Sequence, residues 1–412
     1  MEDSRPSETG LAVDVPPVER DKTPGLPRRA VSRRLRRRIV AGPLVGLLLW
    51  GGASYAHWML QPTSMSYVAR SVEWVRGDVP LGNQIVDTAE HVYYGWKAPT
   101  KGGAPLASLP TVGIVRPSGS LRPGPARRPT SWPTPITPVY PTPLAGEGVW
   151  SPTGATIDGH APVLVTTFRP ERDYPHLIAY VGWFDRTRTA IGYYPGRYEP
   201  PAAAIRGPMM VPIGERSRLL ATFNGGFTYV DGHNGSSDNG LINEPLKRGN
   251  ATLVGYRDGR LDIIDWNGDA KTTADVAWSR QSLAPIVWDG TVNPALNTDP
   301  NSPQWGYTLG GATRVWRTGV GIDRRGNLLY VAAPDQTVIT LAKILQHIGA
   351  VRAMEFDINP EWHTFLTYRD GHDPTPVEPI HMQSKNRYLV PDDRDFFAVY
   401  TRLAGPITVP FS

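Results

Sequence analysis

The sequence predicts an α+β fold: a strand-rich domain with a mixed sheet and one clear crossover helix, preceded by a single transmembrane helix and a Pro-rich linker. Two segments of strand length carry most of this prediction: the apolar run 328–333, and 351–357, which ends in acidic residues. Between them, apolar residues recur at helical spacing over 337–348, and Gly349 stands where a left-handed C-cap belongs. Strand, helix and strand in this order are typical of a crossover unit, in which sites gather at the carboxyl ends of strands.

Earlier in the domain, short apolar runs alternate with turn residues. Strands are expected at 162–168, 177–184, 219–223, 251–256 and 261–266. Asp258-Gly259 separates the last two runs and favours a hairpin turn. Convincing helical periodicity is confined to 337–348, so strands should dominate the domain.

The transmembrane helix is predicted from length and charge. Residues 39–60 contain no Asp, Glu, Lys or Arg over 22 positions, and a bilayer core requires about 20 apolar residues. Seven arginines lie within residues 28–38, so the positive-inside rule places the N-terminus in the cytoplasm and the C-terminal domain outside the cell membrane. A cleaved signal peptide is the alternative, because Ser54-Tyr55-Ala56 is a passable cleavage site. The 38-residue charged lead favours an uncleaved anchor instead.

The charge balance indicates which partners to expect. Residues 1–38 carry 10 basic and 6 acidic side chains, a net charge of +4, and the whole chain carries +5. The remaining chain is therefore about neutral. The expected partner of the basic tail is the lipid bilayer, which residues 39–60 enter, and no nucleic-acid binding is expected. The chain has no cysteine, which excludes disulfides and thiolate metal sites.

Composition divides the chain into five regions. Residues 61–98 show two apolar stripes at helical spacing, typical of short helices, and proline and glycine dominate the segment that follows. The expected regions are a basic cytoplasmic tail, a transmembrane anchor, a juxtamembrane helical segment, a Pro/Gly-rich linker and a C-terminal domain, at 1–38, 39–60, 61–98, 99–147 and 148–412.

Two carboxylates close the second strand of the crossover unit. Glu355 and Asp357 are two residues apart, so on a strand both side chains face the same side. Two like charges on one face are costly unless a cation or a substrate compensates for them. The simpler alternative is a solvated strand end that pairs with Arg352.

A second candidate feature is the turn Asn224-Gly225-Gly226. Paired glycines let a ligand approach the backbone closely, and Asn224 supplies a donor and an acceptor. A plain hairpin turn explains the same residues. The following loop, 231–244, is rich in oxygen but lacks calcium-loop spacing, so no metal is assigned to it. Arg317 suits phosphate because its planar fork binds two oxygens, and an ordinary ion pair is the alternative.

Taken in chain order, these features resemble a known family. The motifs are Asn224-Gly225-Gly226-Phe227, Arg317-Thr318-Gly319-Val320-Gly321, the helix at 337–348, the strand ending in Asp357, and Asn386-Arg387-Tyr388-Leu389-Val390. The combination resembles the phosphodiester glycosidase family, which includes the lysosomal uncovering enzyme. It is most similar to the membrane-anchored actinobacterial branch, whose members share an opening like that at 146–150. The resemblance covers about 219–400. One departure is the loop 358–362, where the family has glycines and a serine.

The resemblance implies a membrane-anchored extracytoplasmic hydrolase that acts on sugar-1-phosphodiester linkages of envelope glycopolymers. Arg317 would hold the phosphate, Asp357 would steady the oxocarbenium ion or activate water, and Glu355 would tune the acidity of Asp357. The expected substrate-binding residues are Asn224, Gly225, Gly226 and Arg387. No cofactor or metal is expected. A non-catalytic envelope protein that binds polysaccharide or assists its export is the alternative.

Overall fold

The computed structural model describes residues 33–112, 131–203, 206–232, 234–268, 273–298, 302–306, 313–369, 371–381 and 383–403, without the side chains of residues 33–44 and 94. Most of the basic tail expected at 1–38, and residues 113–130 of the expected linker, lie outside these described residues. The chain divides into two compact units, Met1–Ala53 and Ser54–Ser412.

Helix α1 (Arg33–Leu60) coincides with the expected transmembrane segment. Over the part of the chain that the structure describes, however, no helix combines the length and apolar character needed to cross a membrane. The predicted anchor at 39–60 and the single-pass membrane localisation derived from it are therefore wrong. The prediction counted charged residues, but a segment without charge is not thereby apolar. Gly51, Ser54 and His57 interrupt the hydrophobic character of the second half of the helix.

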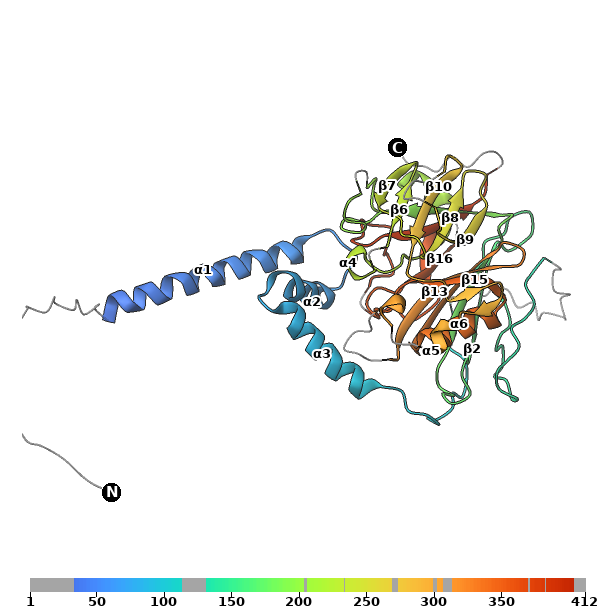
Figure 1. Cartoon of the computed structure of the whole chain (residues 1–412), viewed down its shortest axis with the longest axis horizontal. Coiled ribbons are helices and arrows are strands. Elements are labelled where there is room, and N and C mark those ends of the chain that lie inside the picture. The colour runs from blue at the N-terminus through green and yellow to red at the C-terminus, as the bar shows by residue number, and fades with distance from the viewer. Residues whose placement is uncertain are drawn as a thin grey trace, which may run out of the picture. The chain divides into compact units, whose positions relative to one another are not determined.

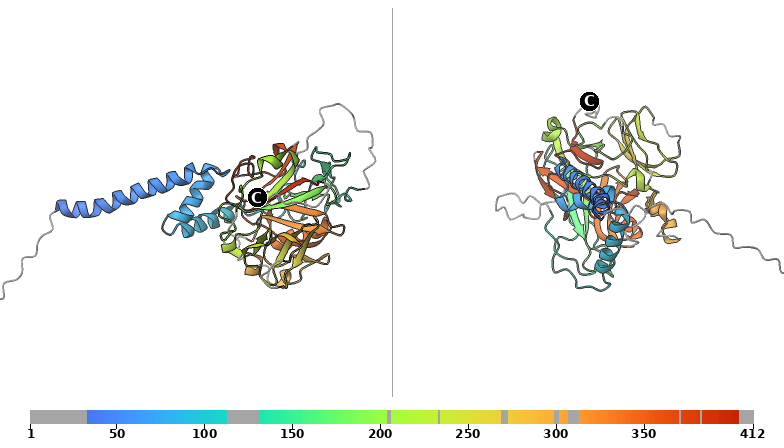
Figure 2. Two further views of the ribbon diagram at one scale, coloured as in Figure 1. Left: turned by 90° about the horizontal axis from the view of Figure 1, so that it is seen from above. Right: turned by 90° about the vertical axis from the view of Figure 1, so that its left-hand side faces the viewer.

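Two short helices follow, α2 (Tyr67–Asp78) and α3 (Gly82–Lys97), in the segment where two helices were expected. Ser66 caps α2, because its side chain accepts a hydrogen bond from the N–H of Ala69. An ion pair between Arg76 and Glu90, with Nη2 and Oε1 2.7 Å apart, joins the two helices. These helices and the strand-rich part of the chain are drawn in Figure 1 and, from two further directions, in Figure 2.

The strands form three sheets. In spatial order, the eight-stranded sheet consists of β1 (Ser151–Pro152), β2 (Val163–Phe168), β3 (Ala179–Phe184), β14 (Leu328–Gln336), β13 (Val315–Asp323), β15 (Ala350–Glu355), β11 (Val287–Trp288) and β12 (Thr291–Val292). One five-stranded sheet consists of β7 (Leu241–Glu244), β6 (Ser236–Asp238), β10 (Val276–Gln281), β8 (Ala251–Tyr256) and β9 (Leu261–Asp265). The other consists of β17 (His372–Pro376), β16 (Phe365–Arg369), β5 (Leu219–Asn224), β18 (Phe396–Thr401) and β4 (Thr189–Tyr194).

The remaining elements are short. They are α4 (Tyr229–Gly232), α5 (Ala295–Thr298), α6 (Val338–His347) and two 3₁₀ turns, Ile213–Arg218 and Pro303–Trp305. Helix α6 begins with a capping box, in which Thr337 and Thr340 exchange side-chain and backbone hydrogen bonds. It ends before Gly349, which has a φ of 102° as the sequence predicted. The hairpin of β8 and β9 turns at Asp258-Gly259, also as predicted.

The expected mixed sheet is wrong, because neighbouring strands in all three sheets of the described chain run antiparallel. Helix α6 does join β14 to β15, but β13 lies between them and pairs with both. Figure 1 shows α6 beside β13 and β15. Inserting the long strand β13 converts what would be a parallel neighbour pair into two antiparallel pairs. The domain is therefore strand-rich with few helices, built from three antiparallel sheets.

Side chains alternate between the two faces of the eight-stranded sheet. Val163, Val165 and Tyr330 point into the main core, which strands of both five-stranded sheets complete. Leu164 and Leu329 point to the opposite face, where they pack with apolar residues of α6. This period of two is the alternation expected for a strand with both faces buried.

Candidate functional site

Glu355 and Asp357 lie at the carboxyl end of β15, but each carboxylate has its own arginine. The Oε1 atom of Glu355 lies 2.5 Å from Nη1 of Arg317, and both side chains are almost completely buried. Arg317 also donates from Nε to the carbonyl of Gln336 at 2.7 Å. Burial raises the pKa of Glu355, Arg317 opposes this change, and the nearby charge of Asp357 adds to it. Arg317 is thus committed to a sealed pair with Glu355.

Asp357 is held by Thr318 of β13. The N–H of Asp357 donates to Oγ1 of Thr318 at 3.0 Å, and the N–H of Thr318 donates to the carbonyl of Asp357 at 2.8 Å. Its Oδ1 accepts from the N–H of Asn359 at 2.9 Å, while Oδ2 lies 3.0 Å from Nη2 of Arg394. Burial raises the pKa of Asp357, and Arg394 and Asn359 oppose that increase. The carboxylate is therefore fixed in one orientation against a single guanidinium group.

Arg394 is the residue of this set that the sequence did not single out. It stands in the acidic run Asp392-Asp393-Arg394-Asp395 just before β18, and its side chain is 18% exposed, compared with 4% for Arg317 and none for Arg387. Its guanidinium carbon lies 4.9 Å from the ring centroid of Trp362. A lone cation among three acids is a signal that the sequence offered. Its position beside Asp357, however, depends on contacts between distant segments.

Arg387 is fully engaged inside the domain. It donates to both carboxylate oxygens of Asp392, at 2.9 and 3.2 Å, and to the carbonyl of Trp362 and Oγ1 of Thr364, each at 2.7 Å. Its guanidinium group also lies 5.3 Å from the Trp362 ring centroid. The sequence predicted a substrate-binding arginine here, and the structure places it beneath Trp362, where it ties together the loop that follows Asp357.

Asn224 joins three sheet strands to the same loop. Its Nδ2 donates to the carbonyl of Gly225 and to Oγ1 of Thr318, and its Oδ1 accepts from Oη of Tyr330 at 2.7 Å and from the N–H of Thr364 at 3.3 Å. Both hydrogens and the oxygen of the amide are therefore used within the protein. This arrangement suits a residue that positions the site around Asp357.

Gly225 and Gly226 are required by close packing. A Cβ at Gly225 would lie 2.5 Å from Oδ1 of Asp395, and one at Gly226 would lie 2.9 Å from Oγ of Ser282. Both contacts are shorter than a side chain tolerates. The turn thus brings the backbone directly against Asp395, the residue next to Arg394. Asn224, Gly225, Asp357 and Thr318 are brought together, while Arg317 and Arg387 are buried on the inner side of the same cluster.

The loop at 358–362, where the sequence departs from the family it resembles, forms part of this site. Trp362 is 5% exposed because Met65 and Ala69, at the start of α2, pack against it. Thr63 and Ser64 donate hydrogen bonds to Asp393 and Asp392 at 3.1 and 2.9 Å. Residues 61–69 therefore cover the tryptophan face of the site.

A metal centre finds no support in the described side chains, among which no three His, Asp or Glu residues are arranged to hold an ion. The oxygen-rich loop at 231–244 is divided between α4, β6 and β7. Glu244 accepts from the N–H of Ala202 at 2.7 Å, and Asp238 lies at the end of β6, where burial raises its pKa to about 7. These carboxylates therefore face different neighbours.

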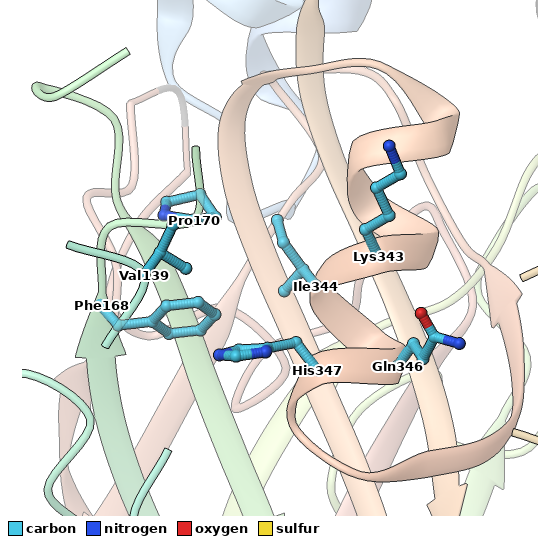
Figure 3. Close-up of a pocket in the computed structure, with 7 residues that line it drawn as sticks. All are labelled: Val139, Phe168, Pro170, Lys343, Ile344, Gln346 and His347. Atoms are coloured by element: carbon cyan, nitrogen blue, oxygen red, sulfur yellow. The ribbon is translucent and has the colours of Figure 1, made fainter. Parts of the chain in front are cut away.

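The pocket drawn in Figure 3 lies elsewhere, on the outer side of α6. It is lined by Val139, Phe168, Pro170, Lys343, Ile344, Gln346 and His347, and shares no residue with the Asp357 cluster. His347 faces Phe168 across it, with ring centroids 5.7 Å apart. Its lining includes one lysine and one histidine but no carboxylate, so it lacks the pairing of a carboxylate with an arginine that Asp357 and Arg394 form.

No protein-family model matches the chain, and no curated protein matches it. Among solved structures, it is similar to the catalytic domain of zebrafish N-acetylglucosamine-1-phosphodiester alpha-N-acetylglucosaminidase, auto-inhibited by its pro-peptide. The identity is 14% and the TM-score 0.40, over 60% of this chain and 87% of that one. A hypothetical protein from Synechocystis has 11% identity and a TM-score of 0.34, over 61% and 65% of the two chains. With TM-scores below 0.5, these similarities leave the activity to be argued from the residues of the site.

Proposed function

We propose that the chain is a hydrolase of sugar-1-phosphodiester linkages and that Asp357 and Arg394 face the substrate. The observation that carries this proposal is the 3.0 Å contact between Oδ2 of Asp357 and Nη2 of Arg394. Of the three arginines in the cluster, Arg394 has the most exposed side chain. A carboxylate and a partly exposed guanidinium group side by side supply the two charges that this reaction needs.

The chemistry assigns one task to each charge. The guanidinium group of Arg394 binds the phosphate oxygens through its fork of N–H donors. Asp357 steadies the positive charge that develops at the anomeric carbon, or removes a proton from the attacking water. The bond between the anomeric carbon and the bridging oxygen breaks, its electron pair stays on the phosphate, and water supplies the new hydroxyl group.

The remaining predicted residues support this pair. Arg317 neutralises Glu355, so that Asp357 does not have an uncompensated carboxylate as its neighbour. Asn224 and Thr318 fix the backbone of Asp357 through the contacts described above. We assign positioning roles to these residues, because their polar groups are engaged inside the protein.

The test is sugar release from a panel of synthetic sugar-1-phosphodiesters by the full-length chain and its Asp357→Asn variant. The asparagine keeps the shape and removes the charge, so the rate should fall about 10²- to 10⁴-fold. Asp238→Asn is the matched control, since it changes a partly buried aspartate in another sheet whose pKa is also raised by burial, and it should keep the wild-type rate. If the wild type releases no sugar but binds a phosphoglycan column, the protein is a binding module and the proposal fails.

A further inference from the structure

We propose that Glu199 is the proton donor of this site and delivers a proton to the departing phosphate monoester. This inference rests on the proposed hydrolysis. It adds a catalytic group and specifies that the phosphate monoester leaves in a protonated form. Glu199 lies in the loop between β4 and β5, outside every motif that the sequence analysis considered.

The backbone places Glu199 directly beside Arg394. The N–H groups of Tyr198 and Glu199 donate to the carbonyl of Asp393, at 3.0 and 3.3 Å. A Cβ at Gly196 would lie 2.5 Å from the carbonyl of Arg394, so this loop packs on the arginine without intervening atoms. Arg394 therefore has Asp357 at its guanidinium end and the Glu199 loop against its backbone.

The side chain of Glu199 is buried but incompletely bonded. Oε1 accepts from the N–H of Tyr229 at 2.7 Å, whereas Oε2 receives no hydrogen bond from any described residue. Glu199 is 5% exposed. One carboxyl oxygen is thus anchored, which leaves the other for a ligand.

The neighbouring cation does not neutralise Glu199. Nη2 of Arg280 is 4.0 Å from Oε1, beyond hydrogen-bond distance. Arg280 is instead bound to Asp395, with Nε and Oδ2 2.5 Å apart, and to the carbonyls of Gln281 and Phe227 at 2.6 and 2.7 Å. Burial in this setting raises the pKa of Glu199 to about 7, with Asp395 adding to the effect and Arg280, Arg394 and the Tyr229 N–H opposing it.

The two carboxyl groups around Arg394 therefore differ in the charges that surround them. Arg394 contacts Asp357 directly and opposes the rise that burial causes in its pKa, whereas no arginine bonds directly to Glu199, whose pKa is raised to about 7. Two carboxyl groups with different neighbouring charges are the arrangement expected for an acid and a base or nucleophile in sugar transfer.

The leaving group explains why a donor of this acidity is useful. A phosphodiester carries one negative charge, and cleavage at the anomeric carbon would release a phosphate monoester with two. The second pKa of such a monoester is about 6, close to that of the donor. In the step, the Glu199 proton moves to a phosphate oxygen as the C–O bond breaks. Water bonds to the anomeric carbon and gives a proton to Asp357, and transfer of a proton from Asp357 to Glu199 through solvent restores both groups.

The test compares two donors with the same sugar, a 1-phosphodiester and a glycosyl fluoride, in full-length wild type and Glu199→Gln. Glutamine keeps the acceptor for the Tyr229 N–H but has no acidic proton. Hydrolysis of the phosphodiester should fall at least about 10²-fold, and hydrolysis of the fluoride, whose leaving group is a weak base, should change less than about 5-fold. In wild type, kcat/KM on the phosphodiester should decline as pH rises through about 7, and this decline should disappear in the variant.

Two further variants separate chemistry from structure. Glu199→Asp keeps an acidic group, so its phosphodiester rate should exceed that of Glu199→Gln and its pH decline should remain. Asp238→Asn removes another carboxyl group whose pKa is raised to about 7, in this case a partly buried one, and should leave the pH profile unchanged. Equal losses on both donors, or an unchanged pH decline in Glu199→Gln, overturn the assignment of Glu199 alone. Absence of wild-type turnover on both donors overturns the proposed hydrolysis, and the role of Glu199 with it.

Discussion

Two acid–arginine pairs stand side by side at the end of β15, and they differ in their access to solvent. Glu355 and Arg317 have side chains 0% and 4% exposed, and Arg317 has a further bond to the Gln336 carbonyl. Asp357 and Arg394 have side chains 6% and 18% exposed, and the guanidinium group lies over Trp362. The first pair is sealed in the sheet, whereas the second borders the surface. Each pair joins one carboxylate to one arginine, and the two acids are only two residues apart, yet the pairs suit different tasks.

The difference shows that the presence of an arginine does not by itself identify a phosphate site. Arg317 and Arg387 have the right chemistry, but each is bonded to a buried acid, Glu355 or Asp392, and donates further hydrogen bonds inside the protein. A buried pair of this kind is costly to break and unavailable to a ligand. Arg394 has fewer internal bonds and some exposure, and these properties qualify it as the substrate-facing cation.

The largest effect that follows from this comparison is on stability. Glu355→Gln leaves Arg317 buried without its counter-charge, so the free energy of unfolding should fall by about 3–5 kcal/mol. Urea unfolding followed by tryptophan fluorescence measures the change. The double variant Glu355→Met with Arg317→Met is the control, because it removes both charges together and should lose less than the single variant. A loss below about 1 kcal/mol in Glu355→Gln would contradict the idea of a sealed pair.

The open pair should respond in activity rather than in stability. Arg394→Ala removes charge-assisted hydrogen bonds to the phosphate. This loss should raise the free-energy barrier by about 1.5–3 kcal/mol, so kcat/KM for sugar release should fall roughly 10- to 150-fold. Because Arg394 opposes the raised pKa of Asp357, its loss should also shift the rising limb of the pH profile to higher pH. The matched control is Arg197→Ala, which removes an arginine paired with Asp393 and without contact to Asp357. Equal losses in both variants would remove the distinction assigned to Arg394.

Local sequence patterns accounted for much of the fold. Periodicity predicted α6 and the strands that flank it, and Asp258-Gly259 predicted the β8–β9 hairpin, because these features depend on neighbouring residues. The mixed sheet was wrong because the position of β13 between β14 and β15 depends on long-range pairing. The membrane anchor was wrong because absence of charge was taken as apolar character.

In the site, too, the residues that depend on local sequence could be predicted, whereas those placed by long-range contacts could not. Asp357, Asn224 and the paired glycines were predicted from their residue types and positions in the sequence, and the structure brings them together around Thr318. Arg394 and Glu199 reach this cluster through the packing of Gly196 on the 392–395 segment, a contact between residues almost 200 positions apart. The burial of Arg317 and Arg387 likewise depends on how the folded chain packs around them, which the local sequence does not reveal.

The smallest expected effect concerns Glu361, an acid of the site loop that has no arginine bonded to it. Burial raises its pKa to about 7, the charges of Glu73 and Glu90 add to this, and Arg76 opposes it. The folded state therefore binds more protons than the unfolded chain between pH 4.5 and 7. Stability contributed by protonated Glu361 is complete below pH 4.5 and is lost as pH rises through about 7. Glu361→Gln should flatten this decline and gain about 1 kcal/mol over wild type at pH 8, relative to pH 4.

Urea unfolding at half-unit steps from pH 4 to 8 measures the two curves. Asp258→Asn is the control, because Arg260 lowers the pKa of that exposed hairpin carboxylate and its titration lies below this window. Its curve should therefore run parallel to wild type from pH 5 to 8. Parallel curves for wild type and Glu361→Gln would place the loop carboxylate in water. They would thereby contradict the burial of Glu361 within the folded chain, from which its raised pKa chiefly arises. A flattened curve for Glu361→Gln alone would instead distinguish three acids of this region: Glu355 sealed by Arg317, Asp357 beside the partly exposed Arg394, and Glu361 partly buried without a bonded cation.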